Sequence, residues 1–343
     1  MSYADGIAAI NLEMPSRVPR TEYSADFHWD LVRAVTGIDV DHKSSEEIQK
    51  KASLAFKKAW NYDFIWNVLI SYNVFGDIIT KMGHGEYASG GTDYDNEIIC
   101  PFNDPEDVLK FDALEVYGIK DKASLIKDFD DDYMKKCSEF PDAVNMTGIY
   151  VTCMSGLIGI FGWEMLLYAA GMDPERFGEV TNRYASWIMQ YFEALAESKA
   201  PVIMVHDDIV WTSGAFLHPD WYRKYIFPNY KKLFAPLLES NKKIIFTSDG
   251  NYTEFIDDIA ETGVHGFVME PDTDMQYIAE KYGKTHVFIG NADNRILLNG
   301  TKEQIYNEVK RCMDIGKKYP GYFMAVGNHI PPNTPVENAL YYN

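Results

Sequence analysis

The sequence predicts a (β/α)8 barrel with an amino-terminal helical extension, and three observations favour this fold. From Val144 onward, short apolar runs bounded by Gly, Asp or Asn alternate with longer amphipathic segments. This alternation is typical of a parallel sheet with helical crossovers. Each apolar run ends in polar residues, as barrel strands do at the mouth that carries the active site. A doubly wound sheet is the alternative, but the chain contains neither GxGxxG nor GxxxxGK[ST].

Six strand-like runs carry this pattern, and the two remaining barrel strands are expected upstream of them. The runs span residues 144–152, 201–208, 242–251, 263–272, 285–294 and 322–332. The helix candidates between and after them span residues 173–198, 218–240, 252–263, 274–283 and 301–319. Their apolar positions recur at helical spacing, which predicts amphipathic helices on the outside of the barrel.

The first part of the chain, residues 1–118, is expected to contain helices and loops. A helix is predicted within residues 44–69, because Ser44 or Ser45 provides an N-cap, glutamates follow, and apolar residues recur at helical spacing. No linker separates this part from residues 144–343, where the βα units are clearest. We therefore expect one domain over residues 1–343.

Composition narrows the class of protein. The chain has 343 residues, of which 46% are hydrophobic, so it can bury a full core. With 51 acidic against 32 basic residues the net charge is -19, which disfavours binding to nucleic acid or to anionic membranes. The amino terminus does not resemble a signal peptide, and no stretch approaches the ~20 apolar residues of a membrane span. A cytoplasmic protein is expected, and the aromatic content of 14% leaves room for a homodimer.

Four cysteines are scattered along the chain. They show no CxxC or paired spacing, so they predict neither a disulfide framework nor a thiolate zinc cluster. We expect Cys100, Cys137, Cys153 and Cys312 to be buried thiols.

Polar residues at the ends of the predicted strands form the candidate site. In a barrel these side chains converge on one mouth. Taken singly, Asp249, Asn251 and Asp293 could be simple turn formers. Taken together, so many polar groups after apolar strands indicate a binding or catalytic site. The set comprises His206, Asp207, Asp208, Asp249, Asn251, Glu270, Asp272, Asn291, Asp293, Asn328 and His329.

Several segments together resemble the uroporphyrinogen decarboxylase superfamily. In the second half these are residues 207–234, 246–251, 261–275, 289–305 and 326–340, of which "GNHIPPNTPVEN" is the most specific. Upstream, "RVPRTEYS" (17–24) stands where the decarboxylases have their arginine-rich loop, and "FGDIITKMG" (75–83) resembles their aspartate-containing segment. The resemblance implies a (β/α)8 barrel with an amino-terminal helical extension.

The superfamily holds two chemistries, and the decarboxylase pattern is incomplete here. Decarboxylation of a tetrapyrrole with many carboxylates requires arginines that face the cavity. This chain has Arg17 and Arg20 but lacks RQAGR, and Asn328 replaces the histidine of the decarboxylases' GHG turn. An acidic mouth is also a poor host for a polycarboxylate.

The other branch contains zinc methyltransferases that pass methyl groups between a small molecule and the cobalt of a corrinoid (cobalamin) on a separate protein. Their coenzyme M members bind zinc through an HxC pair, a late Cys and a nearby acidic residue. Here the HxC positions are Thr247 and Asp249, the late Cys is Asn328, and Glu270 stands at the acidic position. The resemblance therefore implies Asp249 and Glu270 as metal ligands. His329 is favoured as the nitrogen ligand, although its role and that of His206 could be exchanged.

Oxygen ligands make a harder, more electrophilic metal centre than thiolates do. Such a centre suits the polarisation of an ether oxygen, so the resemblance is strongest to the substrate-side methyltransferases of O-demethylase systems, which act on aryl methyl ethers. Another small methylated donor (methylamine, methyl thiol or betaine), a decarboxylase, and a non-catalytic ligand-binding or corrinoid-docking barrel remain alternatives. In the catalytic interpretation His206 is the general acid, held by Asp207 or Asp208, and Asn328 assists. The expected substrate contacts are Arg17, Arg20, Trp163, Trp211, Phe216, Tyr252, Asn291 and Asp293.

Overall fold

The computed structural model describes residues 1–81, 86–88, 91–93 and 98–343, so the last two residues of the 75–83 segment lie outside the described part. Its centre is a parallel sheet in the order β12-β11-β10-β9-β6-β5, and β1 pairs with β4 in parallel. The barrel strands are β1 (Phe64–Ile65), β4 (Val144–Asn145), β5 (Thr147–Ile149), β6 (Val202–His206), β9 (Lys243–Thr247), β10 (Gly266–Val268), β11 (Val287–Ile289) and β12 (Tyr322–Phe323). Two short hairpins pair β2 (Glu86–Ala88) with β3 (Gly91–Asp93) and β7 (Val210–Trp211) with β8 (Gly214–Ala215).

The backbone around Arg20 and Thr21 closes the sheet into a barrel. On one side the Thr21 amide donates to the Met324 carbonyl (3.1 Å), just after β12. On the other side the Asp63 amide, just before β1, donates to the Arg20 carbonyl (2.9 Å). Because β4 and β5 are two parts of one strand, the sheet closes with eight strands. The predicted (β/α)8 barrel is thus confirmed, and its first two strands lie upstream as expected.

Strand periodicity separates the barrel interior from the helical layer. Successive side chains on a strand point to opposite faces. The side chains packed together inside the barrel are accordingly found at alternate positions. They include Phe64, Val144, Met146, Val202, Met204, Ile245, Val268, Val287, Ile289, Phe323 and Ala325.

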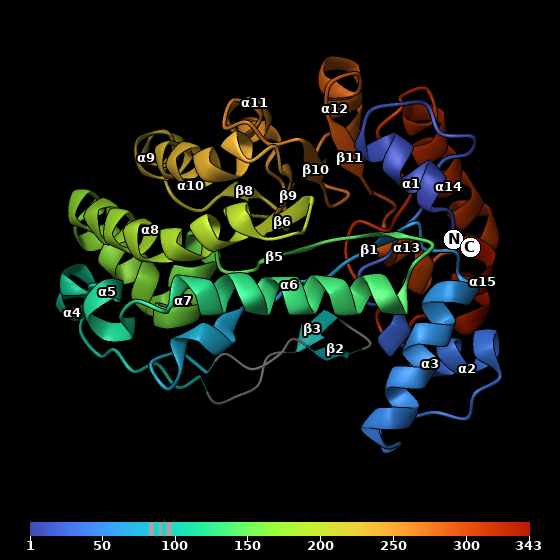
Figure 1. Cartoon of the computed structure of the whole chain (residues 1–343), viewed down its shortest axis with the longest axis horizontal. Coiled ribbons are helices and arrows are strands. Elements are labelled where there is room, and N and C mark those ends of the chain that lie inside the picture. Colours follow the sequence, from blue (N-terminus) through green and yellow to red (C-terminus); the bar gives the residue numbers. More distant parts are fainter. Residues whose placement is uncertain (82–85, 89–90, 94–97) are drawn as a thin grey trace.

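Helices surround the strands, and the amino-terminal helices lie near both chain ends (Figure 1). The amino-terminal half contains α1 (Tyr3–Ile10), α2 (Trp29–Thr36), α3 (Glu46–Ala59), α4 (Pro105–Lys110), α5 (Ala113–Tyr117), α6 (Lys122–Glu139) and α7 (Met154–Met172). The carboxyl-terminal half contains α8 (Pro174–Glu197), α9 (Pro219–Tyr225), α10 (Phe227–Glu239), α11 (Ile256–Ala260), α12 (Met275–Tyr282), α13 (Asn294–Asn299), α14 (Lys302–Gly316) and α15 (Val336–Tyr342). Short 3₁₀ helices are η1 (Ala25–Phe27), η2 (Tyr72–Phe75) and η3 (Thr253–Phe255).

Two predicted helices differ from the observed ones. The segment 44–69 is helical only over α3, with Ser45 as its N-cap, and the chain then enters β1. The segment 218–240 divides into α9 and α10 at Ile226. Pro228 explains the division, because a proline lacks an amide hydrogen and is accommodated in the first turn of a new helix.

Helix α7 corrects an expectation about membrane spans. It has 19 residues, and an 18-residue stretch of it has a mean hydropathy of 1.2, so by length and composition it is apolar enough to cross a membrane. However, 67% of this stretch is buried inside the protein, where α7 lies against α4 and α8. The backbone of Gly162 interrupts the helix with a φ of +68°. The apolar character of α7 is therefore explained by packing in the core.

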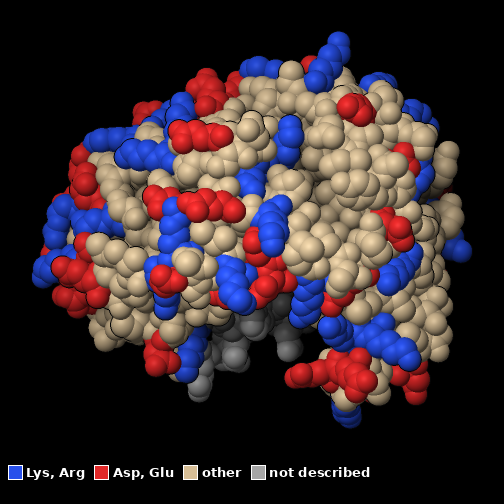
Figure 2. All heavy atoms as spheres, viewed as in Figure 1, with Lys and Arg blue, Asp and Glu red and all other residues tan. Residues whose placement is uncertain are grey.

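The charges do not gather on one side in the view of Figure 2, where acidic and basic side chains are interspersed over the visible face. Of the four cysteines, Cys153 and Cys312 are buried as expected, whereas Cys100 and Cys137 are half-buried, and all four are free.

Candidate functional site

The inward-facing positions of the strands continue past the strand ends and place polar side chains at the barrel mouth. Met204 faces the barrel interior, so His206, two residues later, has the same orientation. By the same alternation Asp249 follows Ile245 on β9, and Glu270 follows Val268 on β10. These side chains come from neighbouring strands and meet at the carboxyl end of the barrel.

His206 is held in one orientation and one tautomer. Its ring is buried and stacks on the ring of Tyr150, with centroids 3.8 Å apart and planes 7° apart. Its Nδ1 lies 3.0 Å from the Tyr150 carbonyl oxygen, which can only accept a hydrogen bond. Nδ1 therefore carries the hydrogen, and Nε2 faces Asp208, 3.2 Å from its Oδ1. The predicted pairing of His206 with one of two aspartates is thus resolved in favour of Asp208.

His206, Asp208 and Asp249 form a cluster that could hold a metal ion. Each offers one ligand atom, and these atoms all lie within 4.8 Å of one another. Asp208 Oδ1 also accepts a hydrogen bond from the Asp249 amide (3.1 Å), which fixes the two aspartates relative to each other. One imidazole nitrogen, oriented by a backbone carbonyl, and two carboxylates make a donor set that suits zinc.

The electrostatics of the cluster also fit a cation. Burial raises the pKa of Asp249 to about 8, and the carboxylates of Asp208 and Glu270 add to the rise. For His206 burial lowers the pKa, but the Asp208 charge and hydrogen bond outweigh it, so the pKa is raised. Burial acts against the charged form of Asp208, yet the His206 ring beside it lowers the pKa of this carboxyl overall. Carboxylates this close together repel one another, and either protons or a divalent cation relieve the repulsion.

Hydrogen bonds of Glu270 and Asn328 stabilise the turn that carries Asp249. Glu270 Oε2 accepts a hydrogen bond from the Gly250 amide (2.6 Å), and its Oε1 accepts one from the Asn328 side-chain amide. Asn328 Oδ1 in turn accepts the His329 amide (2.7 Å). Burial raises the pKa of Glu270. Glu270 thus lies beside the cluster, and its role as a further metal ligand stays a prediction.

A family comparison identifies the barrel. Residues 105–342 match the model of the family described as uroporphyrinogen decarboxylase (URO-D). The chain belongs to the uroporphyrinogen decarboxylase family.

The similar proteins carry two different names. The uroporphyrinogen decarboxylases of Geobacter sulfurreducens and Geotalea uraniireducens are 27% and 29% identical over 178 residues, which is 52% of this chain and 50% of each relative. The chain thus spans about half the length of these curated relatives. A solved structure, a methyltransferase from Methanosarcina mazei, is similar over 100% of this chain and 97% of its own, with a TM-score of 0.65 and 17% identity. At that identity the likeness bears on the fold alone.

Within this URO-D barrel, two predicted site residues are not among the clustered ligand atoms and have other partners. Asp207 is buried on the helical side, where its Oδ1 accepts the amides of Cys153 (3.1 Å) and Ser155 (2.7 Å) at the start of α7. Its Oδ2 accepts the Tyr230 hydroxyl (2.5 Å). The carboxylate is fully occupied, so its position indicates a structural role in place of the predicted catalytic one. His329 has an exposed side chain with Nδ1 against the Ser24 hydroxyl, so the geometry favours His206 as the nitrogen ligand.

Three expected substrate contacts are likewise occupied by the protein. The Asn291 side chain donates to the carbonyls of Glu270 and Thr273 (both 3.2 Å) and accepts from an arginine of α14. Tyr252 is buried, and its hydroxyl donates to the carbonyl of Val268 (2.7 Å). Asp293 caps α13. All three stabilise the loops behind the mouth.

The two arginines of the amino-terminal loop do not reach the mouth. Arg17 forms two 2.8 Å hydrogen bonds with Asp63, which precedes β1 at the amino end of the barrel. Arg20 lies between the barrel and the helices, 5.2 Å from the Trp60 ring centroid and 3.1 Å from Glu22. The structure therefore does not place them with the other predicted substrate contacts.

Three of the four predicted aromatic residues form a cluster at the rim. The rings of Trp163, Trp211 and Phe216 have centroids 5.1 to 5.6 Å apart. The Trp211 carbonyl accepts the Asn251 amide (3.0 Å), which joins this cluster to the turn after Asp249. An apolar ring could therefore pack close to the metal-binding candidates.

Sequence reasoning missed three aromatic residues of the mouth. Tyr150 lies within a correctly predicted strand, and its even spacing from Met146 was the signal that it faces inward. Tyr23 and Trp66 follow the first two strands, which are too short to show alternation.

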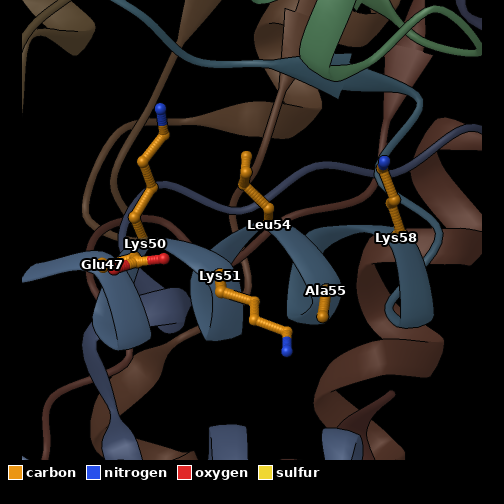
Figure 3. Close-up of a pocket in the computed structure, with 6 residues that line it drawn as sticks. All are labelled: Glu47, Lys50, Lys51, Leu54, Ala55 and Lys58. Carbon is orange, nitrogen blue, oxygen red and sulfur yellow. The ribbon is translucent and has the colours of Figure 1, made fainter. Parts of the chain in front are cut away.

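A groove along α3 is separate from this site (Figure 3). Its lining residues are Glu47, Lys50, Lys51, Leu54, Ala55 and Lys58, all from one face of the helix. None of them belongs to the barrel mouth.

Proposed function

We propose that this protein is a methyltransferase that moves a methyl group from a small O-methylated aromatic compound to the cobalt of a corrinoid carried on a separate protein. The observation that carries the proposal is the cluster of His206, Asp208 and Asp249 beside the aromatic rim. Asp249 stands where thiol-activating relatives are expected to present a thiolate, and the cluster offers nitrogen and oxygen donors in its place. The donor set suits assistance to a leaving oxygen.

The reaction needs help at the oxygen. The methyl group leaves as a cation equivalent, the cobalt(I) co-substrate supplies the electron pair for the new bond, and the oxygen departs as a phenolate that takes up a proton. A divalent metal bound by His206, Asp208 and Asp249 would polarise this oxygen as a Lewis acid. Without a metal, the His206 Nε2–H, whose pKa is raised by Asp208, is the donor for the same oxygen. Metal binding and proton donation exclude each other, because both use the Nε2 atom of His206.

The arginine placement bears on the decarboxylase alternative, which the names of the curated relatives favour. A substrate with many carboxylates requires cations at the mouth, but Arg17 is paired with Asp63 at the amino end of the barrel. A carboxylate-rich mouth supports a neutral or weakly acidic substrate.

The test is methyl transfer from a panel of methoxybenzenes and methoxyphenols to cob(I)alamin, followed by the absorbance change of the cobalt. We expect turnover by the wild type and a loss of about 100-fold or more in His206→Ala. His218→Ala is the matched control, because His218 is exposed and caps α9. Decarboxylation of uroporphyrinogen would establish the alternative activity, and binding of the panel without turnover would favour the non-catalytic barrel.

Metal analysis separates the two modes of assistance. Near-stoichiometric zinc that is lost in Asp208→Asn and Asp249→Asn, and retained in His329→Ala, would support the metal centre. A metal-free protein that still transfers methyl groups would leave acid catalysis by His206.

A further inference from the structure

Three buried hydrogen-bond donors at the mouth lack partners among the residues that the structure describes. They are the Tyr23 hydroxyl, the Trp66 indole N–H and the Thr247 hydroxyl. A buried polar group without a partner destabilises a protein, so such groups are rare unless water or a ligand binds them. The indole N–H can only donate, so its missing partner is an acceptor atom.

These donors face the same space. Trp66 lies two residues after the inward-facing Phe64, and Tyr23 lies two residues after Thr21, whose hydroxyl donates to the Phe64 carbonyl (2.6 Å). The rings of Tyr23 and Trp66 have centroids 4.8 Å apart and both pack against the interior cluster of the barrel. Thr247 is 6% exposed and lies opposite His206 in the β6–β9 ladder.

The unpaired donors and the metal-binding candidates lie at different strands around the barrel, so they could bind opposite ends of one ligand. Tyr23 and Trp66 follow the first and second strands, whereas His206 ends β6, the fourth strand, and Asp249 follows β9, the fifth. The strand that carries Tyr150 lies between the two sets, and Tyr150 stacks on His206. Neighbouring strands lie about 4.8 Å apart, so Trp66 and His206 are roughly two strand spacings apart around the mouth, a span that a substituted aromatic ring would bridge.

We infer that Tyr23 and Trp66 form a subsite for a second oxygen atom of the substrate, separate from the methyl-bearing oxygen at the His206–Asp208–Asp249 cluster. The substrate class is then an aryl methyl ether with another acceptor oxygen on the ring, such as a methoxyphenol. This inference rests on the proposed function for the role of the first oxygen. In the free protein an ordered water would satisfy the donors, and the ligand oxygen would displace it.

Calorimetric titration of the purified protein with 2-, 3- and 4-methoxyphenol and with anisole tests the subsite. We expect at least one methoxyphenol to bind more tightly than anisole, which lacks the second oxygen. Tyr23→Phe and Trp66→Phe should each weaken that binding about 3- to 10-fold and leave anisole unaffected, since each removes one neutral hydrogen bond. Tyr62→Phe is the matched control, because it also removes a buried unpaired hydroxyl, but at the amino end of β1.

The outcomes distinguish this inference from the proposed function. Equal binding of anisole and all methoxyphenols, no binding of any probe, or unchanged affinities in Tyr23→Phe and Trp66→Phe would overturn the subsite. A preserved preference for two oxygens without any methyl transfer would overturn the proposed function and leave the subsite in place.

Discussion

Asp249 holds a proton in the metal-free protein that an ordinary aspartate has lost. Its folded-state pKa is raised to about 8, whereas in the unfolded chain it returns to about 4. Between these values the folded state binds more protons than the unfolded state does. By linkage, the contribution of Asp249 to stability is largest below about pH 4 and is lost as the pH rises through about 8.

Asp249→Asn should therefore stabilise the metal-free protein at alkaline pH. The amide keeps the shape of the protonated acid and cannot ionise, so we expect a rise in Tm of roughly 2–4 °C at pH 9 and little change near pH 4. Thermal unfolding in the presence of a chelator, followed by circular dichroism across this pH range, measures the effect. Asp39→Asn, at an exposed position, is the control. A variant whose Tm follows the wild type at every pH would contradict the assignment.

The turn after β9 shows how one element positions a site residue. Gly250 has a φ of +79°, and a Cβ there would lie 2.7 Å from both the carbonyl carbon and the oxygen of Trp211. The turn and the β7–β8 hairpin therefore touch through their backbones, which cannot move aside as a side chain does. This contact joins the Asp249 carboxylate to the aromatic rim.

Gly250→Ala should lower the free energy of unfolding by more than the cost of placing alanine at a positive φ. Gly37 has a φ of +69° with nothing within 4 Å of an added Cβ, so Gly37→Ala measures the conformational term, about 1 kcal/mol. We expect Gly250→Ala to destabilise by about 1–3 kcal/mol more, because the contact forces the backbone apart. Urea unfolding of both variants provides the comparison. Equal losses would show that the turn and hairpin separate freely.

Elements also differ in how well the sequence predicted them. The six strands from Val144 onward were predicted because each has a short apolar run that ends in polar residues. The first two strands were not located, because β1 is two residues long and the pairing at Arg20 is a single bridge. The prediction that Asp249 and His206 lie close together followed from the barrel fold, because the carboxyl ends of its strands meet at one mouth. The choice between His206 and His329 did not, because it depends on which side of the backbone each ring faces.

At the scale of the whole molecule, a buried carboxylate joins the ends of the chain across the barrel closure. Glu22 accepts hydrogen bonds from the Val326 amide (3.0 Å), the Tyr342 hydroxyl (2.8 Å) and the Arg20 guanidinium (3.1 Å). These groups belong to the first strand, the segment after β12, and α15. The last helix is thereby attached to the strand that closes the barrel.

Glu22→Ala should destabilise the entire fold. The change leaves a guanidinium, an amide and a hydroxyl without their shared acceptor in a buried place, so we expect a loss of about 2–5 kcal/mol in the free energy of unfolding. Chemical unfolding measures this loss, with Glu13→Ala at an exposed position as the control. A loss below 1 kcal/mol would mean that the closure is held by the backbone pairing alone.

The hydrogen bond from His206 Nδ1 to the Tyr150 carbonyl limits how the imidazole exchanges its hydrogens with solvent. Because Nδ1 is closed off by this carbonyl, any hydrogen that the ring exchanges with solvent passes through Nε2 and leaves by the barrel mouth. A molecule seated there would cover the exit, so the imidazole of the complex would be isolated from bulk water for as long as the molecule stays. The rate at which the Nε2 hydrogen exchanges with deuterium would then report directly on the residence time of the ligand.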